Sequence, residues 1–428
     1  MTKLDTLIQE LCPDGVEYKE LKSVFEMRNG YTPSKAKAEF WEGGTIPWFR
    51  MEDIRENGNI LSDSAQHITP AAVKGKLFPA NSIIVATSAT IGEHALITVE
   101  SLANQRFTYL VRRPEYEEKL DPKFVYYYCY KLDEWCLNNT NISSFPSVDM
   151  AKFAKFKIPI PPLPVQREIV RILDNFTELT AELTAELTAR KKQYEYYRDS
   201  LLTFGVHRRG TVETKWRTLG EVCNSIADGD HMPPPKSDSG IPFITISNIT
   251  EQNKVDFSNT MFVPCAYYNA LAEKRKPQKG DILYTVVGSY GIPVCIENET
   301  EFVFQRHIAI LRPKMQIINP RYMYHAMQTT AFKAQADKAA KGAAQKTISL
   351  HSLSEMTLPV PSLEVQERLI DVLDHFDAIC SDLNIGLPAE IEARKKQYEY
   401  YRDMLLTFAA ADDIILTDRQ TDRQTEHN

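Results

Sequence analysis

The chain has 428 residues, of which 43% are hydrophobic and 25% are charged. These proportions are typical of folded globular proteins, and the length predicts one to three domains. The net charge of −7 argues against nucleic-acid binding through bulk positive charge, although it does not exclude local basic surfaces.

Hydropathy and cysteine usage indicate the cellular compartment in which the protein is expected to act. No apolar run approaches the roughly 20 residues that cross a bilayer, and the N-terminal sequence MTKLDTLIQEL has no secretory pattern. The seven cysteines are odd in number and form no C-x-x-C pair. We therefore expect a protein of the reduced cytoplasm, with no membrane contact and no zinc site.

The first 160 residues predict a short N-terminal helix and an α+β module. Residues 1–13 have an amphipathic pattern that ends at the turn sequence Pro-Asp-Gly. Short apolar runs such as SIIVAT and FTYLVRR are rich in β-branched residues and predict strands. The stretch DPKFVYYYCYKLDEW begins with an Asp–Pro pair, which suits a helix N-cap followed by proline in the first turn.

A long helix is predicted at 161–210, where residues 165–204 contain neither glycine nor proline. Positions taken alternately four and three apart from Ile169 to Phe204 are apolar or aromatic in nine of eleven cases, which is the spacing of a coiled-coil seam. At about 1.5 Å per residue the helix would be roughly 60 Å long, which is longer than a small domain is wide. It is therefore expected to hold two bodies apart.

Nearly the whole first half of the chain recurs in the second half. The segment ARKKQYEYYRD at 189–199 returns unchanged at 393–403, and residues 158–176 match 358–376. Shorter matches in the same order predict a second α+β module at 211–360 and a second long helix at 361–411. Two copies in one chain favour an antiparallel helix pair within the chain over a homodimeric coiled coil.

The second long helix departs from the first at Gly386 and Pro388. Proline inside a helix removes a hydrogen bond and costs about 3 kcal/mol or more. This predicts a break or kink near 385–388, with the helix resuming at Ala389. The polar segment 412–428, with its repeated TDRQ, predicts a disordered tail.

Motifs for chemistry are missing from the sequence. It contains no Asn/Asp-Pro-Pro-aromatic loop of an amino-methyltransferase, no G-x-x-x-x-G-K-[ST] phosphate loop, and no histidines at metal-ligand spacing. We therefore expect a non-catalytic chain that holds no cofactor and no metal.

The duplicated modules and near-identical helices, with TAEL repeats at 177–190, closely resemble the specificity (S) subunit of type I restriction–modification enzymes. The resemblance covers essentially the whole chain. It implies two target recognition domains, each for one half of a bipartite site in double-stranded DNA, with the gap set by an antiparallel helix pair. It also implies two methyltransferase (M) subunits and restriction (R) subunits as partners. These would carry methylation, ATPase activity and cleavage, and would bind S-adenosylmethionine, ATP and Mg²⁺.

Two other interpretations stay open at this point. One is a stand-alone enzyme with fused methyltransferase and specificity modules, against which the missing cofactor motifs count. The other is a non-DNA-binding structural adaptor that uses the helices to space two protein-binding modules.

Candidate DNA-binding residues are polar side chains in loops beside strands, at places where the two modules differ. For any one of them, a plain solvated loop residue is an equally good interpretation. The lysine-rich segment 331–347 is expected to grip phosphates. In the first module the candidates are Tyr31, Thr32, Ser34, Lys35, Lys37, Arg50, Thr87, Ser88 and Thr90; in the second they are Asp230, His231, Lys236, Thr245, Ser247, Ser289, Tyr290, Lys341 and Lys346.

The dipeptide Gln–Arg occurs in both modules at the start of a strand, as Gln105–Arg106 and Gln305–Arg306, and we expect the two pairs to occupy matching places. Arginine and glutamine are the side chains best suited to the edges of guanine and adenine. A feature common to two modules with different targets nevertheless favours a structural or phosphate-binding role.

The repeated segment RKKQYEYYRD mixes cations with tyrosines. One interpretation is a docking surface for M subunits, and the other is a solvated helix end with a tyrosine seam. The candidate docking residues are Arg190, Lys191, Lys192, Tyr194 and Tyr197, with Arg394, Lys395, Lys396, Tyr398 and Tyr401 in the second copy.

Overall fold

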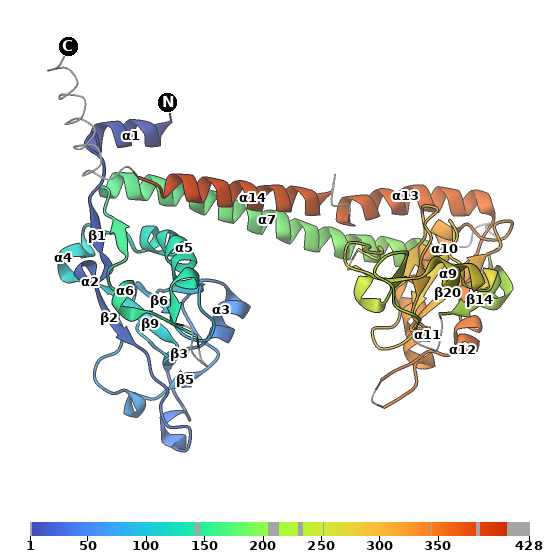
Figure 1. Ribbon diagram of the computed structural model, residues 1–428, viewed down its shortest axis with the longest axis horizontal. Coiled ribbons are helices and arrows are strands. Elements are labelled where there is room, and N and C mark those ends of the chain that lie inside the picture. Colours follow the sequence, from blue (N-terminus) through green and yellow to red (C-terminus); the bar gives the residue numbers. More distant parts are fainter. Residues whose placement is uncertain are drawn as a thin grey trace, which may run out of the picture. The chain divides into compact units, whose positions relative to one another are not determined.

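The computed structural model describes residues 2–141, 146–203, 214–229, 234–250, 252–343, 345–381 and 386–408. The predicted tail at 412–428 lies outside these residues. The chain forms two compact units, Met1–Thr180 with Arg394–Asn428 and Ala181–Ala393. Each unit combines one α+β module with a stretch of both long helices (Figure 1).

The first module is built on a five-stranded sheet with the order β2-β9-β6-β7-β4, in which only β4 and β7 are parallel. A three-stranded sheet has the order β5-β3-β8. In chain order the strands are β2 (Phe25–Asn29), β3 (Ile46–Phe49), β4 (Ile60–Leu61), β5 (His67–Ile68), β6 (Ser82–Ala86), β7 (His94–Ile97), β8 (Leu102–Ala103) and β9 (Phe107–Arg112).

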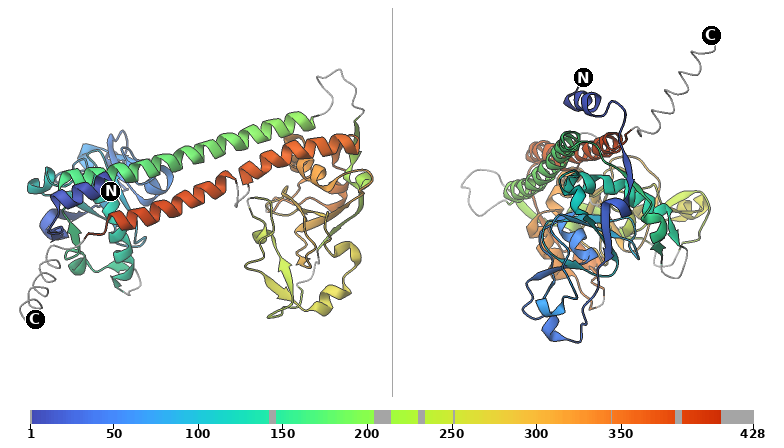
Figure 2. Two further views of the ribbon diagram at one scale, coloured as in Figure 1. Left: turned by 90° about the horizontal axis from the view of Figure 1, so that it is seen from above. Right: turned by 90° about the vertical axis from the view of Figure 1, so that its left-hand side faces the viewer.

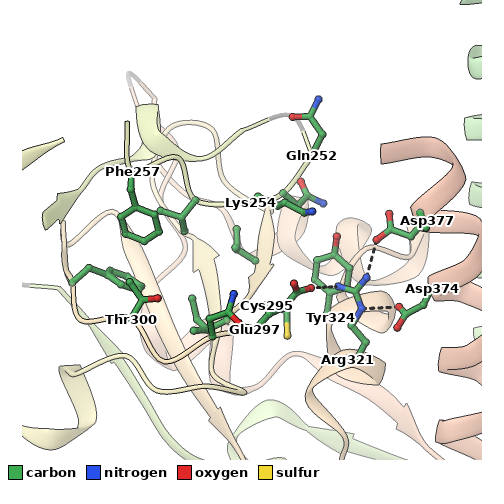
Figure 3. Close-up of a pocket in the computed structure, with 17 residues that line it drawn as sticks. Gln252, Lys254, Phe257, Cys295, Glu297, Thr300, Arg321, Tyr324, Asp374 and Asp377 are labelled. Atoms are coloured by element: carbon green, nitrogen blue, oxygen red, sulfur yellow. Dashed lines mark hydrogen bonds and ion pairs between the residues drawn. The ribbon is translucent and has the colours of Figure 1, made fainter. Parts of the chain in front are cut away.

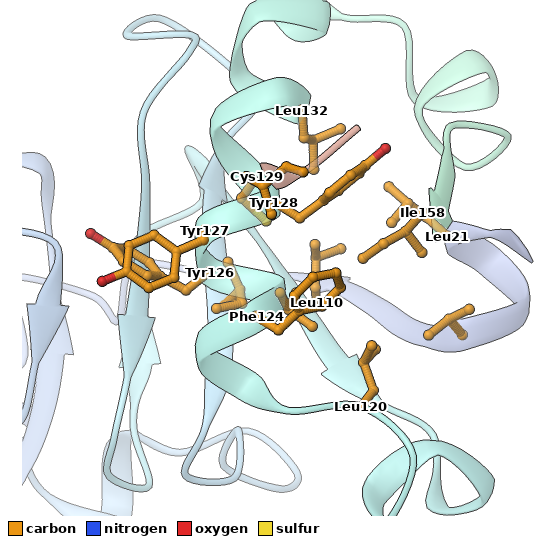
Figure 4. Close-up of a cluster of buried hydrophobic side chains, with 14 of the residues drawn as sticks. Leu21, Leu110, Leu120, Phe124, Tyr126, Tyr127, Tyr128, Cys129, Leu132 and Ile158 are labelled. Atoms are coloured by element: carbon orange, nitrogen blue, oxygen red, sulfur yellow. The ribbon is translucent and has the colours of Figure 1, made fainter. Parts of the chain in front are cut away.

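Both faces of the five-stranded sheet are buried. Successive side chains of a strand point to opposite faces, so Ile83 and Val85 of β6 pack in the cluster that contains the aromatic residues of α5 (Pro122–Asn138). Ile84 and Ala86 pack on the other side, in the cluster that contains β3. Figure 4 shows the α5 side of this core. Burial on both faces explains why β6 reads as a continuous apolar run rather than an alternating one.

Short elements complete the first module. Strand β1 pairs with β12, so the two ends of the module meet beside the start of the long helix. The N-terminal helix α1 is tied to that helix by an ion pair of 2.8 Å between Lys3 Nζ and a Glu168 oxygen. The elements are α1 (Lys3–Leu11), β1 (Tyr18–Glu20), α2 (Leu21–Val24), η1 (Ala38–Phe40), α3 (Met51–Asn57), η2 (Pro70–Ala72), α4 (Pro114–Glu117), β10 (Thr140–Asn141), β11 (Ser147–Val148), α6 (Met150–Phe153) and β12 (Lys157–Pro159).

The second module repeats this plan. A four-stranded sheet has the order β14-β20-β17-β18, and a three-stranded sheet has the order β16-β15-β19. The strands are β13 (Lys215–Thr218), β14 (Cys223–Asp228), β15 (Ile241–Ile244), β16 (Met261–Val263), β17 (Ile282–Thr285), β18 (Pro293–Cys295), β19 (Val303–Phe304), β20 (Ile308–Pro313) and β21 (Thr357–Val360). The helices are α8 (Leu219–Val222), η3 (Ile246–Asn248), α9 (Cys265–Ala270), η4 (Glu273–Arg275), α10 (Pro320–Met327), α11 (Thr330–Ala339) and α12 (Leu350–Ser354).

The two long helices differ in continuity. Helix α7 runs from Leu163 to Leu202, whereas the second long helix consists of α13 (Leu363–Ser381) and α14 (Leu387–Leu405). The predicted resumption at Ala389 is two residues late, because Pro388 stands in the first turn of α14, where a missing N–H costs no helical hydrogen bond. Residues 382–385 lie outside the described part of the chain.

Within each unit a stretch of α7 lies beside the second long helix (Figure 2). The two helices contact one another there through stacked aromatic rings. In the first unit Phe176 of α7 stacks on Tyr401 of α14, with ring centroids 5.5 Å apart. In the second unit Tyr197 of α7 stacks on Phe376 of α13, with centroids 5.7 Å apart. As α7 advances from 176 to 197, its partner runs backwards from 401 to 376. The predicted fold class, two α+β modules with an antiparallel helix pair, is therefore confirmed.

A buried glutamine at the start of each long helix fastens that helix to its module. Gln166 Oε1 accepts the N–H of Asp121, the N-cap of α5, at 2.8 Å. The Gln166 amide donates to the carbonyls of Lys119 and Pro161 at 2.8 and 2.6 Å. Gln366 makes the same three bonds in the second module, with Asn319, Ile317 and Pro361.

Replacing Gln166 or Gln366 by alanine is expected to destabilise the unit that contains it. Each change removes the glutamine partner of one part-buried N–H and of two carbonyls, at a cost of about 1–3 kcal/mol or more. Urea unfolding followed by circular dichroism measures the change. The exposed Gln9→Ala on α1 is the control, and its effect should stay within about 0.5 kcal/mol. Equal effects for all three variants would contradict this role.

Candidate nucleic-acid interface

Polar loops that are far apart in the first module's sequence meet at one end of its sheet. The Thr32 hydroxyl, in the loop after β2, donates to Gln105 Oε1 in the β8–β9 turn at 2.6 Å. The Thr87 N–H, in the β6–β7 turn, donates to the Arg106 carbonyl at 3.0 Å. The Ala89 N–H donates to the carbonyl of residue 146, before β11, at 3.2 Å. We call residues 30–37, 87–90, 104–106 and 146–147 the first loop cluster.

The second module contains an equivalent arrangement. The Val286 N–H donates to the His307 carbonyl at 2.8 Å, and the Gly288 N–H donates to the Lys346 carbonyl at 3.0 Å. A short bridge between Lys341 and Thr347 closes the loop that holds Lys346. Residues 286–290, 305–307 and 341–347, apart from residue 344, which lies outside the described part, form the second loop cluster.

Most of the candidate residues in the first module lie at this cluster, but several of them have structural partners. Ser34, Lys35 and Lys37 are exposed, and Ser88 and Thr90 are half-buried. The Tyr31 hydroxyl donates to the Ala72 carbonyl at 3.2 Å, so this tyrosine anchors the loop that carries the lysines.

Two first-module candidates differ from the others, because Thr87 is buried and Arg50 lies outside the first loop cluster. Thr87 is only 4% exposed, and its hydroxyl is hydrogen-bonded to that of Thr108 at 2.9 Å. The side chain is therefore held inside the module, contrary to the expectation of an accessible loop residue, and its DNA-binding role stays a prediction. Arg50 is half-buried at the start of α3. It directly follows Phe49, the last residue of β3, whose carbonyl accepts the N–H of Asn104 in the β8–β9 turn. Its guanidinium lies 3.9 Å from a Glu52 oxygen.

In the second module the candidates separate in the same way. Lys236, Ser289, Lys341 and Lys346 are exposed, as is Ser247, whose hydroxyl is hydrogen-bonded to that of Thr245. Thr245 caps a short helical turn through Asn248, and Tyr290 donates its hydroxyl to Asp337 at 2.9 Å, so both have structural partners. Asp230 and His231 lie outside the described residues.

Backbone hydrogen bonds correct the expected equivalence of the two Gln–Arg pairs. The Asn104 N–H donates to the last residue of β3 at 3.0 Å, and the Gln305 N–H donates to the last residue of β15 at 2.9 Å. The carbonyls of Arg106 and His307 each accept an N–H from the turn after β6 or β17. The dipeptides therefore differ by one position in structural register. The matching residues are Asn104 with Gln305, Gln105 with Arg306, and Arg106 with His307.

The candidate docking residues differ in exposure, and among the tyrosines only Tyr194 is buried. Tyr194 is 6% exposed and its hydroxyl is hydrogen-bonded to His325 Nδ1 at 2.9 Å, contrary to the expectation of an accessible side chain, and its role in partner binding stays a prediction. Tyr197 and Tyr401 form the seam stacks described above, and Tyr398 is half-buried beside Arg402. Tyr197 is still 40% exposed. The exposed cations are Arg190, Lys191, Lys192, Lys395 and Lys396, while Arg394 is half-buried.

Sequence reasoning missed the most exposed aromatic residues of the helices. Tyr196 and Tyr400 occupy the same position in the two copies of the repeat and are 69% and 66% exposed. The signal was present, because both tyrosines fall outside the alternating four-and-three spacing of the seam.

A polar network joins the second module to the long helices. Arg321 of α10 bonds Asp374 at 2.6 Å and Asp377 at 2.9 Å, and both carboxylates belong to α13. Although burial opposes the charged form, these carboxylates raise the pKa of Arg321. His325 Nε2 is hydrogen-bonded to the same Asp374 at 2.6 Å. Burial outweighs this bond and lowers the pKa of His325. Figure 3 shows Arg321 between the two aspartates, at the wall of a cavity of about 540 Å³.

At the corresponding positions the first module has a lysine and a tyrosine in place of the arginine and the histidine. Lys123 Nζ and the Tyr127 hydroxyl each bond Asp174 of α7 at 2.7 Å. Within the described ranges, no group of three or more His, Cys, Asp or Glu residues is placed to hold a metal ion. The same ranges contain no helix that is both long enough and apolar enough to span a membrane.

Comparison with known proteins assigns the family. A family model described as the type I restriction modification DNA specificity domain matches residues 13–190 and 211–393. The chain therefore belongs to the family of type I restriction–modification specificity proteins, and membership implies a non-catalytic role. The specificity subunit of the type I restriction enzyme EcoprrI from Escherichia coli is 44% identical over 397 residues, which are 90% of this chain and 93% of that protein.

Two further relatives support this assignment. The specificity subunit of EcoR124I/EcoR124II from Escherichia coli is 33% identical over 318 residues, 67% of this chain and 70% of that protein. A solved chain from a study of complex assembly and conformational transition of the type I R-M system shares the fold. Its TM-score is 0.64 at 16% identity, with 92% of this chain and 97% of that chain covered.

The buried His325 should make the second unit sensitive to acid. Its folded-state pKa lies below the ordinary value of 6.5, so the unfolded chain binds the proton more readily. This contribution to stability is complete above pH 6.5 and is lost as the pH falls through the folded-state pKa, by at most about 1.4 kcal/mol per pH unit. Urea unfolding between pH 7 and pH 5 should therefore show a weaker pH dependence for His325→Gln than for the unchanged chain. His375→Gln, at an exposed site on α13, should leave the dependence unchanged, and a His325→Gln profile parallel to the wild-type profile would refute the assignment.

Proposed function

We propose that this chain is the DNA-specificity subunit of a type I restriction–modification complex, in which each module reads one half of a bipartite site. The family match across both modules is the observation that carries this proposal. It fits DNA recognition and does not fit the alternative of an adaptor that never contacts DNA.

The loop clusters are the proposed contact surfaces. Each gathers polar loops at one end of a buried sheet, where a rigid scaffold can hold side chains against base edges. Lys35 and Lys37 in the first cluster and Lys341 and Lys346 in the second are exposed and suited to phosphate contacts. The acidic total charge is compatible with this proposal if partner subunits supply further phosphate contacts.

The long helices set the gap between the half-sites in this proposal. Helix α7 is uninterrupted through its TAEL repeats, so a change in its length changes the span between the residues that each module binds. One repeat of four residues adds about 6 Å of helix. This is less than two steps of about 3.4 Å along a DNA strand.

Two M subunits and additional R subunits complete the proposed assembly. The identical segments 189–199 and 393–403 each expose two lysines and a tyrosine at matching positions, which suits two copies of one partner. Lys191, Lys192 and Tyr196 in one copy, and Lys395 and Tyr400 in the other, form the proposed docking strips. The aromatic residues supply contact area and the lysines supply charge complementarity.

The chemistry of the complex is assigned to these partners. We propose that S-adenosylmethionine, ATP and Mg²⁺ bind in the M and R subunits, where methylation, ATPase activity and cleavage would take place, and that the complex acts in the cytoplasm. This chain would contribute sequence recognition and geometry.

Deleting Thr184–Leu187 from α7 tests the proposed function. The deleted residues are one TAEL unit, and Thr184 to Glu186 are exposed, so little buried surface is lost. Cells that express the chain with an M subunit should methylate a bipartite site, and the deletion should shorten its gap by one or two base pairs while both half-sites stay the same. Sequencing of methylated adenines measures both quantities.

Two outcomes of that experiment would contradict the proposal. Methylation at a continuous site, or at none, in cells with the unchanged chain would refute bipartite recognition. An unchanged gap in the deletion variant would refute the role of the helix length. Replacing the same four residues by TAEV is a control that keeps the helix length, and should keep the gap.

Reversing the charges of Arg190, Lys191 and Lys192 to glutamate should weaken copurification with the M subunit. Lys191 and Lys192 of this docking strip, with the neighbouring Arg190, would then repel the surface that complements them. Size-exclusion chromatography should show a species with one M subunit, because the second copy of the segment is unchanged. The control variant carries Lys155→Glu and Lys157→Glu, at exposed sites outside the strips, and it should still bind two M subunits. If the variant at 190–192 also binds two M subunits, docking at that segment is refuted.

A further inference from the structure

We infer that the central turn of each loop cluster, residues 104–106 and 305–307, carries the side chains that decide which base that module selects. The inference rests on the proposed function and names the residues that perform it. The second and third residues of each turn are the specificity-determining positions: Gln105 and Arg106 in the first module, Arg306 and His307 in the second.

The backbone of the turn is fixed on two sides in both modules. On one side the first residue, Asn104 or Gln305, donates its N–H to the end of β3 or β15 at 3.0 or 2.9 Å. On the other side the carbonyl of Arg106 or His307 accepts the N–H of the turn after β6 or β17, at 3.0 or 2.8 Å. Four hydrogen bonds therefore place two different sequences on one backbone path.

A glycine packs closely against the backbone that leads into each turn. Gly30 follows β2 and Gly229 follows β14, and each lies against the strand that leads into the turn. A Cβ atom on Gly30 would stand 2.1 Å from the Ala103 carbonyl oxygen, and one on Gly229 would stand 2.0 Å from that of Phe304. Only a residue without a side chain allows this approach, so the same close contact recurs where the surrounding loops have diverged.

Side chains that differ on an invariant backbone are what a common scaffold needs for two specificities. Gln105, Arg106 and Arg306 are exposed and His307 is half-buried. Glutamine pairs best with adenine and arginine with guanine in the major groove. The mismatch in register removes the argument against base contact, because the two arginines are not a shared feature at one structural position.

Neighbouring groups orient two of these side chains. The Thr32 hydroxyl donates to Gln105 Oε1 at 2.6 Å, which leaves the amide hydrogens of Gln105 available to an acceptor. Burial and the adjacent Arg306 lower the pKa of His307, so its imidazole is neutral at pH 7 and offers one donor and one acceptor. Lys341 and Lys346, on the loop beside the turn, are placed for phosphate contacts instead.

Arg306→Ala in the complex with M subunits tests the inference. The probes are the duplex identified by methylation mapping, the same duplex with each base pair of both half-sites changed in turn, and an unrelated duplex. Arg306→Ala should weaken binding to the mapped duplex by roughly 5- to 150-fold and should abolish discrimination at one base pair of one half-site. Discrimination in the other half-site and affinity for the unrelated duplex should stay unchanged.

Lys346→Ala is the matched control, because this cation is also exposed and lies on the adjoining loop. It should weaken binding to all duplexes alike and lower the salt dependence by about one phosphate contact. Gln105→Ala should repeat the Arg306 result in the other half-site. If Arg306→Ala behaves like Lys346→Ala, or leaves binding to the mapped duplex unchanged, the inference is overturned. If the unchanged complex has no bipartite preference, the proposed function itself fails.

Discussion

The attachment of each long helix to its module is the constraint on which the rest of the structure depends. A module connected to a helix by a flexible link could not hold a half-site at a defined place. Gln166 and Gln366 exclude such a link, because each fully buried side chain makes three hydrogen bonds that join the helix start, the preceding proline segment and the N-cap of the module's helix. The ends of the opposite helix then pack on the same unit, as the rings of Phe176 with Tyr401 and of Tyr197 with Phe376 show.

The two attachments have the same plan but different polar groups. In the first module Lys123 and Tyr127 hold Asp174, whereas in the second Arg321 and His325 hold Asp374. A lysine and a phenol keep their protonation states near neutral pH, and an imidazole does not. The two attachments therefore share one plan, and the second adds a buried imidazole whose pKa lies below its ordinary value.

Structural and binding roles belong to different side chains of the same segments. The buried Tyr194 makes a hydrogen bond inside the second unit and Tyr197 stacks on the neighbouring helix, whereas Lys191 and Tyr196 are exposed and accessible to a partner. Within the modules, close backbone contacts at Gly30 and Gly229 recur beside the central turns, which differ in the side chains that they display. One architecture can thus serve two different half-sites.

The sequence by itself determined the duplication, the α+β class, the long helices and their antiparallel pairing. These features follow from periodicity and repeated segments, which express local backbone geometry. It also indicated the loops that assemble at the end of each sheet. Tertiary structure alone decided that Thr87 and Tyr194 point inward, because burial depends on what packs against a residue. It also decided that Arg306 corresponds to Gln105 rather than to Arg106. The identical Gln–Arg dipeptides suggested the wrong structural equivalence between the two modules. Equivalent positions are set by hydrogen bonds between segments that are distant in the chain, which sequence identity does not show.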